Sequence, residues 1–207
     1  MTDDQWAHER TLVLAESAEL ADLDRYASGR GWPRTADTPP GYATMRQVGW
    51  ENGDTSALWM ESGRYGVRFV CVAGPSGTDV AATAEALAGV LPVVTEDAML
   101  AVLTADDPAE PAEALRALHR LATQYLIRRL RGMPTTPDDR YRTMAERTVA
   151  HPDPTVRHAL LMLFADLMTE RPEVVPPILA YDADGGELAD LAGAFAAIAA
   201  EKGIPVA

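Results

Sequence analysis

Residues 150–169 read Ala-His-Pro-Asp-Pro-Thr-Val-Arg-His-Ala-Leu-Leu-Met-Leu-Phe-Ala-Asp-Leu-Met-Thr. Two prolines flank Asp153, and an apolar run follows them. Asp153 is predicted to be the N-cap of a helix and Pro154 to occupy its first turn, because these residue types are favoured there. The expected helix over 154–169 is apolar on most of its circumference, so it must lie between neighbouring elements. We therefore expect stacked helices in this half of the chain.

Helical patterns continue on both sides of this stretch. A helix is predicted over 111–131, where apolar residues fall on one side at helical spacing and polar residues on the other. Further helices are predicted over 137–149, 172–180 and 187–201, with a turn at 182–186. We interpret 111–207 as an all-helical domain.

The heptapeptide Asp153-Pro154-Thr155-Val156-Arg157-His158-Ala159 matches the Asp-Pro-x-Val-Arg-x-Ala signature at the turn and second helix of HEAT-type repeats. Residues 137–203 resemble two consecutive HEAT-like helical pairs. The first pair matches, whereas the second is degenerate, because Asp184-Gly185-Gly186-Glu187-Leu188 contains no Val-Arg.

The HEAT-like resemblance implies structural roles for the signature residues. It implies that Asp153 caps the helix, Val156 packs inside and Arg157 bonds along the stack. It also implies a binding surface, since most members of this family bind other proteins. A free-standing solenoid normally needs at least three repeats. Two pairs must therefore lean on helix 111–131, on the sheet, or on another subunit.

The N-terminal half is predicted to mix helix and strand. A helical segment is expected over 3–28, within a first region 1–32, and Pro/Gly-rich residues 32–41 are interpreted as a linker. Strands are predicted over 42–50, 55–61 and 67–73, with a hairpin at Asn52-Gly53. A helix over 79–90 follows, and 98–104 fits either a fourth strand or a short helix.

Together these patterns predict an α+β fold. It comprises an N-terminal helix, a small antiparallel β-meander with covering helices in a domain over 42–110, and a C-terminal HEAT-like helical array. Trp50, Trp59 and Phe69 are expected to fix the sheet against a helix; the alternative is that one tryptophan is an exposed anchor for a partner.

Composition narrows the function classes. The chain has 207 residues, is 47% hydrophobic and carries a formal net charge of −13, which argues against general attraction to nucleic acid or anionic membranes. Cys71 is the single cysteine, so an intrachain disulfide is impossible, and we expect it to be buried. The acidic N-terminus and the absence of a long apolar run predict a cytoplasmic protein without a membrane segment. Abundant arginine with one lysine is typical of bacterial sequences.

A turn between the third strand and the next helix is a weak candidate phosphate-binding loop. Its residues are Gly74, Ser76, Gly77 and Thr78, and backbone N–H groups at such a position can hold a phosphate. The turn lacks a P-loop lysine and the glycine spacing of a dinucleotide fingerprint. The competing interpretation is a tight turn with Ser76 or Thr78 as helix cap.

A cluster of arginines is the second candidate site. Residues 116–147 hold eight arginines and three acidic residues, in a chain that is otherwise strongly acidic. Such a face could track nucleic-acid phosphates, bind an acidic protein surface, or pair internally with carboxylates. The candidate binding face comprises Arg116, Arg120, Arg128, Arg131, Arg140 and Arg142.

No catalytic, metal or cofactor motif of comparable quality is found. The histidines, His8, His119, His151 and His158, lack the spacing of a metal site. We therefore expect a non-enzymatic protein-interaction module, an adaptor or a neutralising partner such as an immunity protein. The alternatives are a nucleotide- or small-molecule-binding enzyme domain at Gly74–Asp79, and nucleic-acid binding through the arginine face.

Overall fold

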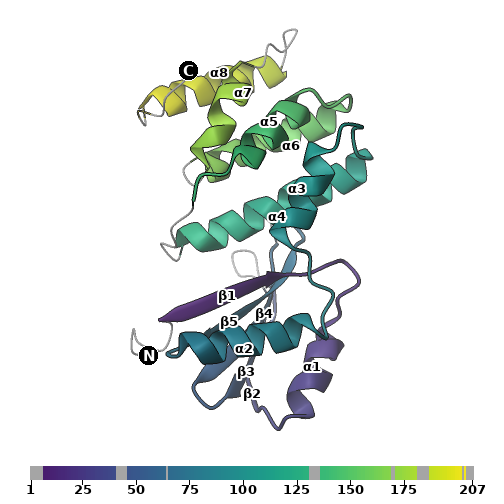
Figure 1. Cartoon of the computed structure of the whole chain (residues 1–207), viewed down its shortest axis with the longest axis vertical. Coiled ribbons are helices and arrows are strands. Elements are labelled where there is room, and N and C mark those ends of the chain that lie inside the picture. Colours follow the sequence, from purple (N-terminus) through teal and green to yellow (C-terminus); the bar gives the residue numbers. More distant parts are fainter. Residues whose placement is uncertain are drawn as a thin grey trace. The chain divides into compact units, whose positions relative to one another are not determined.

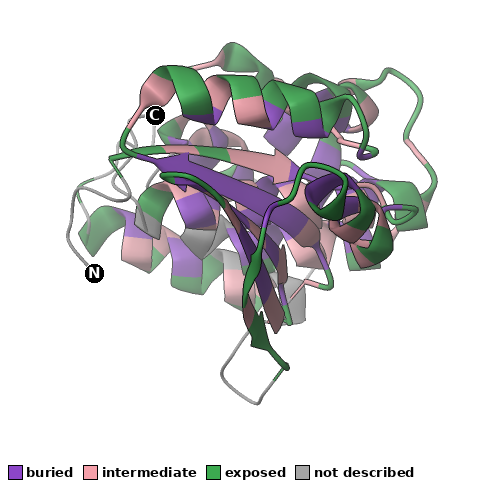
Figure 2. Ribbon diagram, turned by 90° about the horizontal axis from the view of Figure 1, so that it is seen from below, coloured by how far each residue is buried: buried purple, intermediate pink, exposed green. Residues whose placement is uncertain are grey.

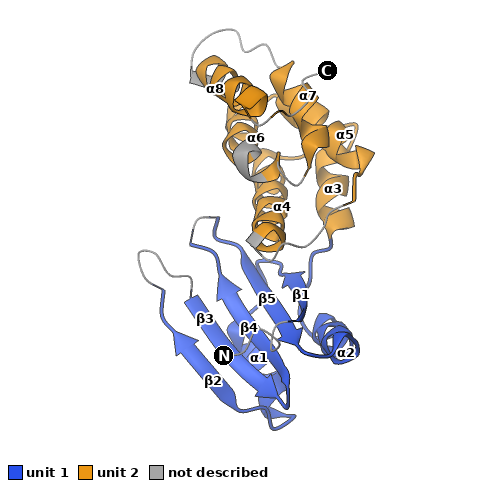
Figure 3. Cartoon of the chain, turned by 90° about the vertical axis from the view of Figure 1, so that its left-hand side faces the viewer, with its two compact units in different colours: residues 1–95 blue, residues 96–207 orange. Residues whose placement is uncertain are grey.

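The computed structural model describes residues 7–40, 46–63, 65–130, 136–168, 171–180, 187–201 and 203. Contacts between Cα atoms divide the chain into two compact units, Met1–Thr95 and Glu96–Ala207 (Figure 3). The first unit contains the sheet and two helices, and the second is helical. The α+β class predicted from the sequence is confirmed.

A five-stranded antiparallel sheet forms the first unit. Its strands are β1 (His8–Val13), β2 (Arg34–Thr38), β3 (Arg46–Asn52), β4 (Thr55–Glu61) and β5 (Arg68–Gly74). Their spatial order is β1-β5-β4-β3-β2 (Figures 1 and 3). The predicted meander is therefore the centre of a larger sheet, to which the N-terminal strand is added beside β5.

The β3–β4 hairpin turns at the predicted place. Asn52 pairs with Thr55, so Gly53 and Asp54 form a two-residue loop. Gly53 has φ of 59°, a conformation that other residues adopt only with strain. Glycine is therefore the residue that this tight connection requires.

Two helices, α1 (Leu20–Ser28) and α2 (Gly77–Ala88), cover one face of the sheet. Their buried residues join Trp50 and Trp59 in one hydrophobic core, and the two tryptophans are only 2% and 1% exposed. They are core residues, as expected, and not exposed anchors. Because side chains alternate along a strand, Phe69 lies on the opposite face from Val70, the register partner of Trp59. Cys71 shares that opposite face and is buried, as predicted.

The helix predicted over 3–28 is wrong over most of its length. Residues 8–13 form β1, which pairs with β5 from His8↔Gly74 to Val13↔Phe69, and the helix begins only at Leu20. Residues 3–6 lie outside the described part. The segment forms a strand because its backbone hydrogen-bonds to β5, which is distant in the sequence. A local periodicity pattern cannot indicate such pairing.

The linker interpretation of 32–41 is also wrong in part. Residues 34–38 form β2, the edge strand beside β3, and its pairing is irregular between Arg34 and Ala36. Four of its five residues are exposed, so the strand has no apolar alternation to reveal it. Proline on either side is compatible with an edge strand.

The second unit contains helices α3 (Glu96–Thr104), α4 (Pro111–Leu130), α5 (Asp139–Val149), α6 (Pro154–Leu167), α7 (Val175–Leu179) and α8 (Glu187–Glu201), with a short 3-10 turn at Pro172–Val174 (Figure 1). The predicted helices are confirmed to within three residues at their described ends; Arg131 and Thr169 lie outside the described part. The helices bury one side and expose the other (Figure 2). Residues 182–186, the predicted turn, also lie outside it.

Residues 98–104 are helical and belong to the second unit. Met99, Leu100 and Leu103 are buried on one side of α3, which packs against α4 and α5. This result confirms the helical alternative over the strand. The boundary between the units accordingly lies between Thr95 and Glu96, and not at residue 110 as predicted.

The signature before α6 has the predicted structural contacts at two of its three positions. The Asp153 carboxylate accepts a hydrogen bond from the Thr155 amide at 2.7 Å, and Val156 is fully buried. The backbone N–H bond of Thr155 holds the pKa of Asp153 below its usual value. Arg157 instead donates to the carbonyls of His151 and Pro152, in the turn that precedes its own helix.

Candidate functional site

A buried polar cluster joins several helices of the second unit. Glu96 lies at the start of α3, Tyr125 on α4, Tyr141 on α5, and Arg171 directly before the 3-10 turn. Both tyrosine hydroxyls donate to the Glu96 Oε1 at 2.9 Å, and they also contact each other. Arg171 donates from Nη2 to the Tyr125 hydroxyl at 2.9 Å, and its guanidinium lies 4.3 Å from the centre of the Tyr141 ring.

Glu96 has partners beyond the two tyrosines, whereas the buried Nε of Arg171 has no hydrogen-bond partner among the described residues. Glu96 also accepts a hydrogen bond from Gln124 at 2.9 Å and pairs with Arg128 at 3.2 Å. Burial raises the pKa of Tyr125 to about 12, and burial also raises the pKa of Tyr141. Tyrosines that keep their protons at neutral pH are poor bases and nucleophiles. The arrangement therefore holds helices together and does not resemble an active site.

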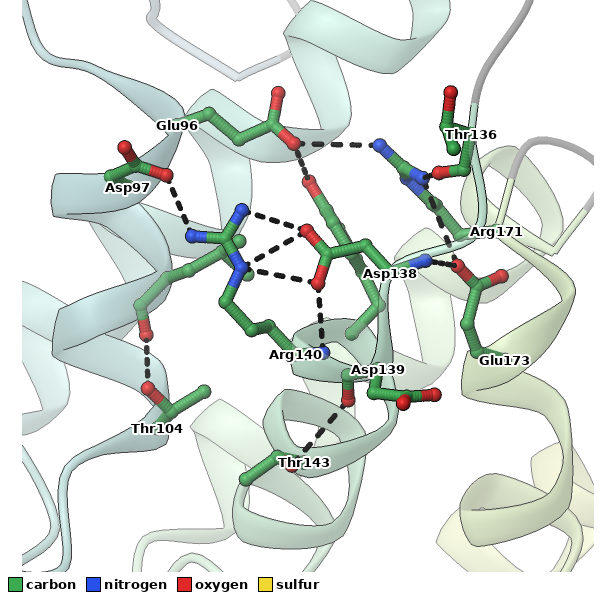
Figure 4. Close-up of polar contacts among 12 residues, drawn as sticks. Glu96, Asp97, Thr104, Thr136, Asp138, Asp139, Arg140, Thr143, Arg171 and Glu173 are labelled. Atoms are coloured by element: carbon green, nitrogen blue, oxygen red, sulfur yellow. Dashed lines mark hydrogen bonds and ion pairs between the residues drawn. The ribbon is translucent and has the colours of Figure 1, made fainter.

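A second layer of ion pairs surrounds Arg171 (Figure 4). Arg171 lies 3.7 Å from Glu173 and donates to the carbonyl of Thr136. The Glu173 carboxylate accepts from the Asp138 amide at 2.8 Å, and Asp138 pairs with Arg140 at 2.7 Å. These contacts fix the start of α5 against the segment that follows α6.

The structure separates the predicted arginine face into different environments. Arg128 pairs with Glu96, and Arg140 pairs with both Asp97 and Asp138. The hydrogen bond from Arg140 lowers the pKa of Asp138. Arg116 and Arg120 lie half-buried on α4, and neither is without a partner. Arg131 lies outside the described residues. The six arginines therefore do not present one set of free cations.

Arg142 differs from these arginines because it lines an open groove. The groove has a volume of about 540 Å³ and runs between α5 and α7. Four residues of the α5 side and three residues of the α7 side line it: Arg142, Glu146, Val149, Ala150, Pro176, Pro177 and Ala180. Among the described residues, the side chains of Arg142 and Glu146 make no hydrogen bond or ion pair. Within the described part of the chain, both charges are therefore available to a ligand.

A smaller pocket of about 140 Å³ lies between the α3–α4 connection and the α5–α6 turn. His151 lines it and is 7% exposed. Its Nδ1 accepts from the Asp153 amide at 3.1 Å, and its Nε2 lies 3.0 Å from the Ala109 carbonyl oxygen. The proton of the neutral ring therefore belongs on Nε2, and both ring nitrogens are occupied by the backbone. His151 has a structural role here.

The glycine-rich turn is a helix cap. Ser76 is the N-cap of α2, and its hydroxyl accepts from the Asp79 amide at 3.3 Å. A Cβ at Gly77 would lie 3.2 Å from the His8 ring, and one at Gly74 would lie 3.0 Å from the Asp54 carbonyl oxygen. These glycines are explained by close packing, and Thr78 is exposed in the first turn. The contacts give no support to a phosphate site.

The described residues contain no group of three or more His, Cys, Asp or Glu side chains arranged to hold a metal ion. None of the described helices is both long and apolar enough to cross a membrane.

Comparison with protein-family models, with curated proteins and with solved structures finds no match to this chain.

The sequence predictions missed the Glu96 cluster and the groove. Glu96 and Arg171 are 75 residues apart, and no motif joins them. The sequence contains one signal, because Tyr125 and Tyr141 both fall on the apolar sides of the helices predicted over 111–131 and 137–149. A buried tyrosine hydroxyl needs a hydrogen-bond partner, so two of them predict a buried polar group nearby.

Proposed function

We propose that this protein is a non-enzymatic protein-interaction module with a HEAT-like helical half, and that the α5–α7 groove is its binding surface. The observation that carries the proposal is the groove itself. It combines two charges of opposite sign, which have no partner among the described residues, with an apolar wall that contains two prolines. Interaction surfaces are commonly built as apolar patches with a few charges that fix the register of the partner.

The arginine face and the Gly74–Asp79 turn give less support to nucleic-acid or nucleotide binding than the groove gives to protein binding. The arginines proposed for nucleic acid include Arg128 and Arg140, which are paired with carboxylates of the same unit. The turn proposed for a nucleotide is packed by His8 and Asp54. A cytoplasmic adaptor or neutralising partner agrees best with the open groove and the acidic surface.

The test is a selection of phage-displayed peptides on the full-length protein, followed by measurement of dissociation constants. Ala180→Arg places a long side chain in the groove and should weaken the selected peptides at least tenfold. Ala86→Arg is the matched control, because Ala86 is exposed on α2, outside the groove. Peptides whose affinity is the same for wild type and Ala180→Arg would place binding elsewhere and refute the proposal.

A further inference from the structure

The two charges of the groove stand along α5 in the order that is less favourable for pairing within one helix. Arg142 precedes Glu146 by four residues, so their side chains are neighbours on the helix surface. An acid placed N-terminal to a base is the better order for pairing within one helix, and here the order is reversed. The adjacent arginines Arg140 and Arg147 bind Asp97 and Asp106, whereas Arg142 and Glu146 have no partner among the described residues.

The exposed side of α5 forms a stripe that a second helix could cover. Asp139, Arg142, Glu146 and Ala150 are exposed and recur at helical spacing, while the alternate side is buried. Ala150 and Ala180 are small, so another backbone can come close to the groove. The prolines of α7 offer rigid apolar surface without backbone N–H groups.

We propose that the occupant of the groove is a second copy of this chain, with the two α5 helices antiparallel across a twofold axis. In that arrangement Arg142 of one copy faces Glu146 of the other, and the reciprocal pair forms at the same time. A twofold interface is self-complementary in this way, since each contact occurs twice. The inference rests on the proposed function, because it names the partner that this binding surface takes.

Charge complementarity favours a second copy over an unrelated partner. When two opposite charges lie on one helix, an antiparallel copy of that helix places each charge opposite its counterpart, so no different partner sequence is needed. Antiparallel neighbours also bring the positive end of one helix dipole to the negative end of the other. The small residues between the helices would allow the interaxial distance of about 8–10 Å that packed helices adopt.

Sedimentation velocity of the full chain over a range of micromolar concentrations tests the inference. Wild type should show reversible dimerisation. Arg142→Glu leaves two acidic residues in each groove, and Glu146→Arg leaves two basic residues. Each variant alone should dimerise at least tenfold more weakly, because like charges would face each other.

An equimolar mixture of the two variants is the decisive sample. In a heterodimer every Glu of one copy faces an Arg of the other, so dimerisation should return. A pair within one chain cannot produce this recovery. Arg25→Glu, an exposed change of the same charge on α1, should dimerise like wild type.

Three outcomes would overturn the inference: a monomeric wild type, single variants that dimerise normally, or a mixture that stays monomeric. If wild type is monomeric while the selected peptides still depend on Ala180, the proposed function survives and the second copy is rejected. If neither peptides nor dimerisation depend on the groove, both proposals fail.

Discussion

Arg171 is the residue on which the polar contacts of the helical unit converge. It is 4% exposed and contacts Glu96, Tyr125, the Tyr141 ring and the Thr136 carbonyl. Burial would lower the pKa of Arg171, but its hydrogen bond to Tyr125 and the charge of Glu96 raise it. The cation is therefore a stable part of the folded state.

Arg171→Met should lower the free energy of unfolding by about 3 kcal/mol, because it leaves part of a buried ion pair without its partner. Glu96 keeps Arg128, which places the loss at the low end of the range for buried pairs. Urea denaturation followed by circular dichroism measures the effect. Arg25→Met, at an exposed pair, should change stability little. Equal effects of the two substitutions would contradict the structural role.

Tyr125 makes stability depend on alkaline pH. Burial raises its pKa in the folded protein to about 12, above the value of about 10 in the unfolded chain. Its contribution is complete below pH 10 and is lost as the pH rises toward 12, since only the unfolded chain releases the proton easily. Unfolding free energies measured from pH 8 to pH 12 should fall, and less steeply in Tyr125→Phe. An unchanged slope in that variant would exclude this assignment.

At the scale of the element, the cap of α2 can be tested separately from any ligand. Ser76→Ala should lower the unfolding free energy by about 1 kcal/mol, because the Asp79 amide loses its acceptor. Thr78→Ala is the matched control, as Thr78 is exposed in the same turn and makes no cap bond. Thermal denaturation of the three proteins decides the matter. A larger loss of unfolding free energy in Thr78→Ala than in Ser76→Ala would show that Ser76 is not the residue that caps α2.

The elements that were predictable are those whose own residues contain the pattern. Helix α6 has its cap, its proline and its apolar run within one stretch, and β4 is preceded by Asn52-Gly53. Strands β1 and β2 were missed because their evidence lies in the partner strand. β1 alternates polar and apolar residues only weakly, and β2 is an exposed edge.

The candidate sites were less predictable for a related reason. A count of arginines identifies a basic segment, but it cannot show which carboxylates they meet. Arg140 and Arg147 find Asp97 and Asp106, residues more than 40 positions earlier in the chain. The predicted binding face includes Arg142 with the other arginines, and only the packing of α5 against α7 distinguishes it.

At the scale of the whole molecule, the net charge argues against nucleic-acid binding. The chain carries −13, and several of its arginines are neutralised internally. We expect no binding to a fluorescent DNA duplex at an ionic strength of about 0.15 M, where non-specific attraction requires free cations. Fluorescence anisotropy measures this. Binding that is lost in Arg142→Glu and kept in Arg25→Glu would contradict the expectation and support nucleic-acid binding through the arginine face.

Cys71 is buried in the middle of β5, so the rate at which its thiol reacts in the native protein reports how often the structure around it opens. The chain has one thiol, and a reagent such as an aromatic disulfide can reach it only when the structure around Cys71 opens transiently. The rate of colour development in native buffer would therefore measure the frequency of such openings at a single known position. Comparison of that rate with and without groove-binding peptides would show whether peptide binding to the helical unit changes how often the sheet opens at Cys71.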